Sequence, residues 1–467
     1  MTPAAGAART GMDPLMLRGL AQWISDLERG AFDGGALPDI GLKNGTLIIE
    51  NESSGRSVAF QHISIRLSRP DHGGAVLTFT SQGPSSTATL VATLGPLRDR
   101  QRTLDFELND VATQDLVQAF TQDWRRFYVD MPLTASALAR ISQEGQVLAA
   151  EASVKLGAGQ IGNGEDPQER FTLDSMQLGL KLDPAARSIA ISPLSAVKNA
   201  NIVSLEGQIA VPRLAEQDWT YELHQQQVIL AGPEMPDPPL VMDQVKVTGR
   251  FTPPNKQLLF ETGSLVSTGG SLTFSGMADF GVEVPILRLK AVGSQMPSTM
   301  VRRFWPVSIA PPARQYVLEN VTDGTIDGTT VDVNMPLDLI GQKEVPLPED
   351  AVHLEMSGSG FTIEALDGLP PIRDGKLSIV VTGRSVRANL PSGTVVTPQG
   401  RKLQTSDGVF FLPDYFPREP KAQVSVKFAG PADAGIELLG MEALKGPTGT
   451  AYDPSTTRGR TNPAPPG

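Results

Sequence analysis

The sequence predicts a mainly β protein, built as an antiparallel sheet with one apolar face and one polar face. Short segments in which every second residue is apolar recur between Leu104 and Phe428, for example at 245–251, 271–276 and 422–428. A period of two places alternate side chains on opposite faces of a strand. The segments lack the long apolar runs that are typical of buried parallel strands. Gly and Pro number 46 and 38 and are spread along the chain, as expected where turns join many short strands.

Composition and charge narrow the classes of function. A chain of 467 residues suggests roughly two to four domains. The net charge is −11 and the pI is near 5.0, without a basic stripe, which argues against nucleic acid as a partner. The absence of cysteine excludes disulfides, thiolate metal sites and cysteine nucleophiles. The sequence contains no apolar run of about 18 residues, so we predict no transmembrane helix, and residues 1–11 lack the features of a signal peptide.

The N-terminal region precedes the strands. Residues 1–13 are small and polar, and we expect them to be disordered. Residues 14–28 fit an amphipathic helix, with Leu17, Leu20 and Ile24 on one face. We expect this helix to cap the end of a sheet, and its sparse basic residues make a membrane-surface helix the weaker alternative.

The strands begin at Ile40 and are punctuated by Asp-Gly and Asn-Gly pairs. These pairs predict tight hairpin turns between antiparallel neighbours, because they readily adopt the positive φ that such turns need. They stand at 44–45, 323–324, 327–328, 367–368, 374–375 and 407–408.

Short helical segments interrupt the strands. Residues 113–120 and 434–444 each fit a short helix, and residues 298–304 and 311–318 flank a proline-rich corner in which Pro312 suits a helix start. We therefore expect sheet modules separated by short helices. The predicted divisions are a helix with a first module at 14–130, a second module at 131–320 that ends in the proline-rich corner, a third at 321–446, and a disordered tail at 447–467.

Residues that could carry chemistry are few. Ser195 and Lys198 match the Ser-x-x-Lys spelling of penicillin-binding enzymes, but they lie in a strand-rich stretch without the companion motifs. Asp323, Asp327 and Asp332 do not have the spacing of a calcium loop, and we assign the first two to turns. We predict no catalytic residue, no metal site and no cofactor, and therefore no enzyme. The histidines are far apart, without the spacing of a zinc site: His62, His72, His224 and His353.

The segment at 302–314 is unusual because it combines Trp305-Pro306 with a proline-rich link. Phe304 and Trp305 could plug one edge of the sheet, and Arg303 and Arg314 could cap helix ends or pair with carboxylates. We favour this structural role over a direct role in ligand binding.

These residues carry a resemblance to a known family. The segment and the strand that follows it resemble the signature of AsmA-like envelope proteins of the YhdP-type branch. Residues 37–50 and 371–377 are also similar to segments of that branch, and the resemblance covers roughly residues 14 to 430. The signature residues, to which we give a structural role, are Arg303, Trp305, Pro306, Pro311, Arg314 and Gly324.

The resemblance implies a repeating β-groove, an elongated and curved antiparallel sheet that forms an open groove with a few short helices. Such proteins are anchored in the inner membrane and are thought to carry phospholipids through the periplasm to the outer membrane. The family's N-terminal transmembrane helix and much of its C-terminal region are missing from this sequence. We therefore expect a periplasmic fragment whose partners are phospholipid and, in the full-length family member, the inner and outer membranes.

The predicted function is the binding and passage of phospholipid acyl chains along an apolar groove. The alternative is a non-catalytic structural envelope protein with a closed β-sandwich or barrel core, and a cryptic hydrolase is a weaker one. An open apolar cavity or a sealed core would separate the first two. The expected groove lining consists of apolar residues from the alternating segments: Val245, Val247, Phe251, Leu272, Phe274, Leu287, Leu289, Val424, Val426 and Phe428.

Overall fold

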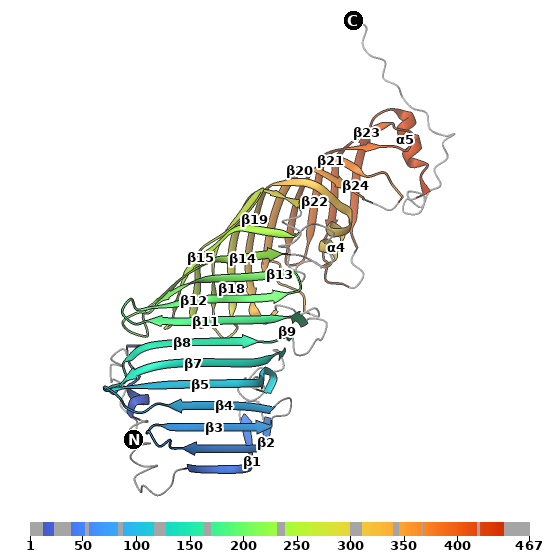
Figure 1. The fold of residues 1–467 in the computed structure, drawn as a ribbon. Helices are drawn as coiled ribbons and strands as arrows, with labels where there is room; N and C mark the ends of the chain where they lie inside the picture. The colour runs from blue at the N-terminus through green and yellow to red at the C-terminus, as the bar shows by residue number, and fades with distance from the viewer. Residues whose placement is uncertain are drawn as a thin grey trace, which may run out of the picture. The chain divides into compact units, whose positions relative to one another are not determined.

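A mainly β, antiparallel architecture is confirmed by the computed structural model (Figure 1). Twenty-one strands belong to one sheet, which is not closed on itself, and three short strands form a second sheet. The chain divides into an N-terminal unit, residues 1–231 with 244–263, and a C-terminal unit, residues 232–243 with 264–467. The structure describes residues 13–22, 39–51, 56–82, 87–115, 128–162, 170–230, 239–298, 311–339, 345–365, 368–417 and 421–442.

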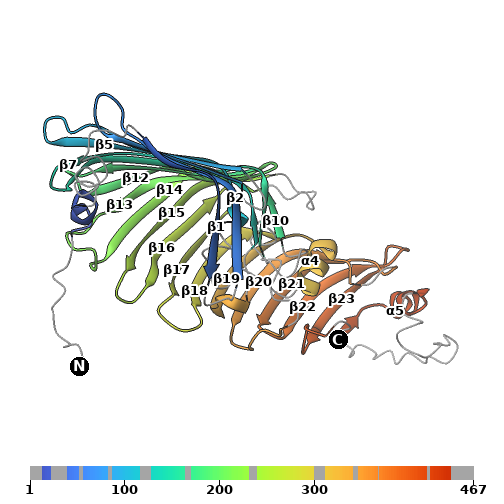
Figure 2. The ribbon, with the colours of Figure 1, turned by 90° about the horizontal axis from the view of Figure 1, so that it is seen from below.

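The main sheet of the N-terminal unit is a meander in which each strand pairs antiparallel with its neighbours. This sheet is visibly curved when it is seen from below (Figure 2). Its strands are β1 (Asp39–Asn51), β2 (Arg56–Ser68), β3 (Ala75–Gln82), β4 (Thr87–Leu94), β5 (Gln101–Ala112), β7 (Pro132–Ser142), β8 (Val147–Leu156), β11 (Ser175–Asp183), β12 (Ser188–Lys198), β13 (Asn201–Ala210) and β14 (Trp219–Leu230). The small second sheet contains β6 (Tyr128–Asp130), β9 (Gly159–Gly162) and β10 (Arg170–Leu173).

The C-terminal unit is a second antiparallel meander. Its strands are β17 (Gly270–Asp279), β18 (Ile286–Pro297), β19 (Val321–Pro336), β20 (Val352–Ile363), β21 (Ile372–Thr382), β22 (Val386–Val396), β23 (Lys402–Leu412) and β24 (Gln423–Ala429). Residues of β15 (Leu240–Thr252) and β16 (Gln257–Ser267) contribute to both units. The helices predicted at 311–318 and 434–444 are present as α4 (Pro311–Asn320) and α5 (Ala432–Leu439), and a 3-10 turn, η2, covers Leu337–Leu339.

The prediction that the Asp-Gly and Asn-Gly pairs form hairpin turns is wrong for most of them, because they lie inside strands. The pairs at 44–45, 323–324, 327–328, 374–375 and 407–408 fall within β1, β19, β21 and β23. The expected positive φ is present: Asn44, Asp323, Asp374 and Asp407 have φ of 57, 57, 52 and 50°. A β-bulge uses the same left-handed conformation as a hairpin turn, so the dipeptide alone does not distinguish them.

These bulges line up across the C-terminal unit. The pairing register shifts at Asp327 in β19, at 359–360 in β20, at 374–375 in β21, at Pro391 in β22 and at 407–408 in β23. All lie close to one row of the sheet, in which Gly358 pairs with both Ile326 and Leu377. A bulge bends its strand and increases the local twist. Five neighbouring strands therefore bend along one line, which we call the crease.

Several predictions fall wholly or partly outside the described residues. They are the disordered termini, residues 23–28 of the first helix, most of the helix at 113–120, and the corner around Trp305. Within the described residues, 18–22 and 113–115 are helical. No helix in the described part of the chain is long and apolar enough to cross a bilayer. The division into three modules stays a prediction.

Candidate functional site

An apolar face runs across the whole N-terminal unit. In the sheet register, many apolar residues of one strand stand beside an apolar residue or a glycine of the next, and together they form rows that cross the strands. The first row crosses all eleven strands from β1 to β14 without a polar side chain: Ile40, Leu67, Leu77, Ala92, Phe106, Ala137, Ala152, Leu180, Ile191, Gly207 and Leu223.

Two further rows flank the first one. The second row stays apolar over ten strands and then meets Gln225 in β14, whereas the third runs from β3 and ends at Tyr221. The second row is Leu42, Ile65, Phe79, Leu90, Leu108, Ala135, Val154, Leu178, Leu194 and Leu205. The third row is Ala75, Leu94, Leu104, Ala139, Ala150, Leu182, Ile189, Ile209 and Tyr221.

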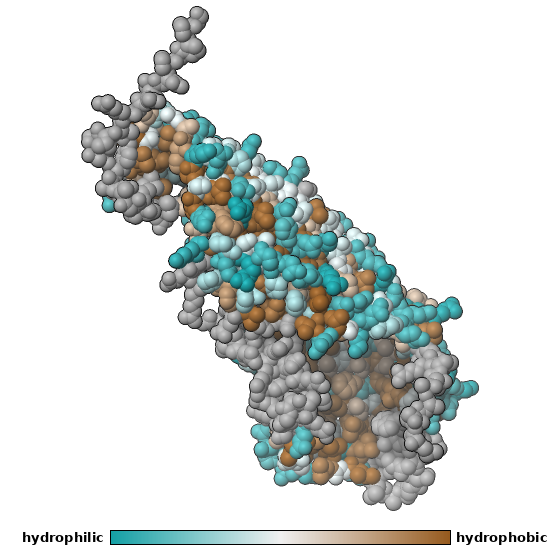
Figure 3. All heavy atoms as spheres, turned by 180° about the vertical axis from the view of Figure 1, so that it is seen from behind, coloured by the Kyte–Doolittle hydropathy of each residue, from teal (hydrophilic) through white to brown (hydrophobic). Residues whose placement is uncertain are grey.

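The centres of these rows are partly exposed. Between β3 and β14, every side chain of the second row and all but Ile191 of the first are neither buried nor fully exposed. Full burial is instead concentrated at strand ends, as at Leu94, Val111, Ile141 and Val147. A second packed layer would make the middle of each strand its most buried part. Figure 3 shows the result as a hollow lined by apolar side chains over the N-terminal strands.

The floor of this face is lowest at β7 and β8, where the rows consist mostly of alanine. Taller side chains rise on both sides, because β5 contributes two leucines and Phe106, and β11 contributes three leucines. Two neighbouring strands span about 10 Å, so the floor is a shallow trough that follows the strand direction. Its alanines are Ala135, Ala137, Ala139, Ala150 and Ala152, and its walls are Leu104, Phe106, Leu108, Leu178, Leu180 and Leu182.

The segment at 13–22 closes one end of this trough. The backbone N–H of Val147 donates to the carbonyl oxygen of Leu15 at 2.9 Å, and that of Leu17 donates to the carbonyl oxygen of Gly145 at 2.7 Å. Leu20 packs against a buried cluster that contains Ile141 and Val147. The segment therefore covers the strand ends of the β7–β8 hairpin, as a sheet-capping helix would.

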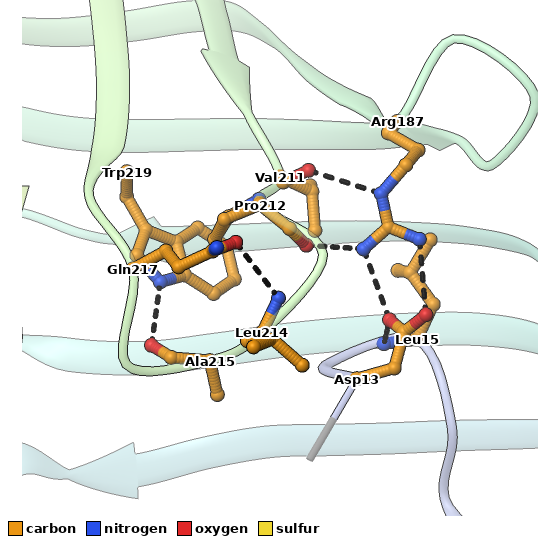
Figure 4. A network of polar contacts seen from close by, with 9 residues as sticks. All are labelled: Asp13, Leu15, Arg187, Val211, Pro212, Leu214, Ala215, Gln217 and Trp219. Carbon is orange, nitrogen blue, oxygen red and sulfur yellow. Dashed lines mark hydrogen bonds and ion pairs between the residues drawn. The ribbon is translucent and has the colours of Figure 1, made fainter. Parts of the chain in front are cut away.

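Arg187 holds the segment at 13–22 in place through hydrogen bonds (Figure 4). Its guanidinium donates to both carboxylate oxygens of Asp13, at 3.1 and 3.0 Å, and to the carbonyl oxygens of Val211, at 3.2 Å, and Pro212. The hydrogen bond from Arg187, supported by one from the backbone N–H of Leu15, holds the pKa of Asp13 below its ordinary value. A bidentate arginine–carboxylate pair is among the stronger surface contacts.

The opposite face of the sheet is polar. Lys246 pairs with Glu222 at 2.7 Å, and this contact lowers the pKa of Glu222. Two wide depressions on this face, of about 440 and 450 Å³, have mixed polar and apolar linings, which include Glu151 and Lys181 in the first and Glu261 in the second. The apolar and polar faces of the N-terminal unit are thus separated, as alternation predicts.

The C-terminal unit has comparable rows, but its apolar face is more deeply buried. Val317 of α4 packs on the cluster of Val381, Val386 and Leu412, and Tyr316 stacks on Phe410 with ring centroids 6.4 Å apart. The apolar cavity beside Val317 is small, with a volume of about 30 Å³. One row is Phe274, Ala291, Val331, Leu354, Val381, Val386 and Leu412.

The predicted lining residues lie in three places. Those of β17 and β18 are partly exposed and share the apolar face, since Leu272, Phe274, Leu287 and Leu289 pair with Gly293, Ala291, Ala278 and Gly276. Those of β15 differ in exposure: Val245 is buried, Val247 is partly exposed and Phe251 is exposed. Those of β24 are Val424 and Phe428, which are exposed, and Val426, which is partly exposed.

The predicted lining and the three rows of the N-terminal unit do not overlap, although Val245, Val247 and Phe251 belong to that unit. The rows between β3 and β14 contain none of the ten predicted residues. The signal is present as alternation at 104–108 and 178–182. The alanines of the trough give a weak hydrophobic signal because their side chains are small.

Of the signature residues, Arg303, Trp305 and Pro306 lie outside the described residues, and Pro311 and Arg314 lie in the first turns of α4. Gly324 lies in β19 at φ 80°.

The candidate catalytic residues remain dispersed. Ser195 and Lys198 are three residues apart in β12, so their side chains lie on opposite faces of the strand. His224 and His353 contact Glu206 and Glu355 at 3.1 and 2.9 Å, whereas His62 lies 2.6 Å from Asn44 and His72 is exposed. The described residues contain no group of three or more His, Asp or Glu side chains that could hold a metal ion.

Comparison of the chain with protein-family models, with curated proteins and with solved structures finds no match.

Proposed function

We propose that the apolar face of the N-terminal unit binds the acyl chains of phospholipids and lets them pass from strand to strand. The observation that carries this proposal is the first row, which crosses eleven strands without a polar side chain and is partly exposed over most of its length. Non-catalytic passage requires a continuous apolar lining and no reactive group. Each buried CH₂ would contribute about 0.8 kcal/mol.

The size of the face suits an extended chain. Eleven strands at about 4.8 Å spacing make a face about 50 Å across. The rows offer side chains of similar polarity at every step, so a chain would meet no large barrier from one strand to the next. The alanine trough adds depth where the walls of β5 and β11 rise. Together with the resemblance to AsmA-like proteins, this supports a periplasmic protein that acts between the inner and outer membranes.

The alternative function, that of a non-catalytic structural protein with a closed core, is favoured in the C-terminal unit alone. There α4 covers part of the apolar face and leaves a cavity of about 30 Å³, which is too small for an acyl chain. A closed core in the N-terminal unit would instead require a covering layer over the centres of the rows. The partly exposed rows make acyl-chain binding the better account of that unit.

Photocrosslinking tests this proposal with neighbouring positions. Phe106 faces the rows, where it pairs with Ala92 and Ala137, and Glu107 faces the polar side. A photoreactive phenylalanine analogue at position 106 should capture co-purified phospholipid in native mass spectrometry, whereas the same group at 107 should capture little. Equal capture at the two positions, or none at 106 from a lipid-containing extract, contradicts acyl-chain binding on this face.

A charge placed in the trough gives a second test. Ala137→Arg puts a guanidinium on the floor, and Ser136→Arg puts it on the opposite, exposed face of the same strand. We expect Ala137→Arg to reduce bound phospholipid about tenfold, because the desolvation of a charge opposes chain binding. Ser136→Arg should leave lipid content unchanged. Thermal unfolding of both variants separates lost binding from lost folding.

A further inference from the structure

The first strand of the N-terminal unit has an unusually apolar edge. Within the described residues, β1 pairs with β2 alone. Its side chains Ile40, Leu42, Leu47 and Ile48 are 46, 53, 42 and 57% exposed. Natural end strands are commonly protected from further pairing by charges, prolines or short length. A 13-residue strand with four exposed aliphatic side chains is instead suited to pairing with another strand.

A bulge in β1 makes its two halves self-complementary. Ile40 and Leu42 pair with Leu67 and Ile65 on the apolar face, and the register shifts at Gly45 bring Leu47, the partner of Phe60, to the same face. Gly41 and Ile48 lie on the polar face, opposite Arg66 and Ala59. Residues 42 and 47 therefore share one face although their separation is odd.

We propose that β1 pairs antiparallel with β1 of a second copy of this chain, with Leu42 of each copy opposite Leu47 of the other. A two-fold axis perpendicular to the sheet generates this arrangement and keeps the apolar faces of both copies on one side. In the same register, Gly41 lies opposite Ile48 of the second copy, so the most exposed of the four side chains meets a glycine.

Charge and size are compatible with this partner. Asp39 would approach Glu50 of the second copy, and Arg66, whose Nη2 lies 2.7 Å from Asp39, offsets the repulsion. The edge is about 44 Å long and about 10 Å thick, which is less area than a standard specific interface buries. We therefore expect a dimer that dissociates in the micromolar range. Pairing through β24 is disfavoured because that strand has seven residues and its Lys427 already binds Asp407 at 2.9 Å.

Disulfide trapping tests the register, because the chain contains no cysteine of its own. Differently tagged Leu42→Cys and Leu47→Cys chains are mixed and oxidised. Opposed residues lie within the span of a disulfide, whereas two copies of residue 42 would be about 17 Å apart. We expect about tenfold more mixed disulfide than either variant forms alone. No excess of the mixed product overturns the register.

Sedimentation equilibrium of the unmodified full chain tests the dimer itself. Leu42→Lys should weaken association at least about tenfold, because a charge on the edge opposes strand pairing. Val424→Lys is the control, since Val424 is 71% exposed on β24. A chain that stays monomeric up to about 100 μM, or a dimer that Leu42→Lys leaves unchanged, overturns the proposal. Lipid capture at Phe106 is measured separately and does not depend on either result.

Discussion

At the scale of the residue, Gly324 shows how closely the C-terminal unit packs at its crease. Its φ is 80°, a conformation that residues with a side chain rarely adopt. A Cβ placed on it would lie 2.4 Å from Cδ1 of Phe361, whose side chain is 3% exposed. Both the backbone conformation and the contact with the ring therefore require glycine at this position.

Gly324→Ala should lower the free energy of unfolding by about 1–3 kcal/mol, from backbone strain and displacement of the Phe361 ring. Gly328 is the matched control, because it lies in the same strand with no atom within 4 Å of its Cβ position. Gly328→Ala should change stability little or increase it slightly. Urea unfolding compares the two. Equal effects would show that the Phe361 contact has no energetic consequence.

The identity of single residues predicted part of the backbone conformation. Asp and Asn before Gly indicated positive φ, and Asn44, Asp323, Asp374 and Asp407 have it. It did not predict whether the residue stands in a turn or in a strand, because that depends on the register of two neighbouring strands. The strands on either side of Asp374, for example, are β20 and β22, and the register with each of them skips Asp374.

At the scale of the element, the crease divides each of the five strands from β19 to β23 into two segments. Asp374 in β21 has φ 52°, and the register with β22 shifts between Arg373 and Lys376. Because the irregularities occupy neighbouring strands, a change in one strand must be accommodated by the next. The crease is therefore a property of five strands and not of one turn.

Asp374→Val should destabilise the protein by about 1–3 kcal/mol, because a β-branched residue at positive φ is strongly disfavoured. Asp374→Gly should be neutral or stabilising, since glycine adopts this conformation without strain. Arg373→Val, an exposed neighbour in the same strand, controls for the loss of a polar side chain. Guanidinium unfolding ranks the three. If Asp374→Val and Arg373→Val are equally stable, strain at the crease is not significant.

At the scale of the whole molecule, each unit contains a stabilised carboxylate and a partly buried tyrosine. Arg187 lowers the pKa of Asp13 in the N-terminal unit, and Arg384 lowers that of Asp414 in the C-terminal unit. Burial raises the pKa of Tyr221 and of Tyr415 to about 12. The hydroxyl of Tyr221 donates to the carbonyl oxygen of Leu259, and that of Tyr415 donates to those of Thr382 and Gly383.

These shifts predict a stability plateau between acid and alkaline limits. A carboxylate with a lowered folded pKa stabilises the fold above its unfolded pKa of about 4, and this contribution is lost as the pH falls through the folded value. A tyrosine with a raised pKa stabilises the fold fully below pH 10, and this contribution is lost as the pH rises towards 12. The melting temperature should therefore fall below about pH 4 and above about pH 10.

In the C-terminal unit, two variants test which group causes the acid decline in stability and which causes the alkaline decline. Asp414→Asn should reduce the acid decline, with a loss of about 1 kcal/mol or less at neutral pH because the ion pair is about one-third exposed. Tyr415→Phe should reduce the alkaline decline and leave the acid one unchanged. Thermal unfolding from pH 3 to 11 measures both. An unchanged alkaline decline in Tyr415→Phe contradicts the assignment.

Local sequence patterns predicted the two-faced strands, the antiparallel class and the helices α4 and α5, because alternation and helix-start residues act over a few neighbouring positions. The register that aligns Phe106 with Ala137 and Ala152 with Leu180 is visible in the three-dimensional structure and not in the local pattern. The same holds for the coverage of the apolar faces, one of which is partly exposed and the other partly covered by α4. A period of two states which residues share a face, but strand pairing and coverage depend on contacts between segments far apart in the chain.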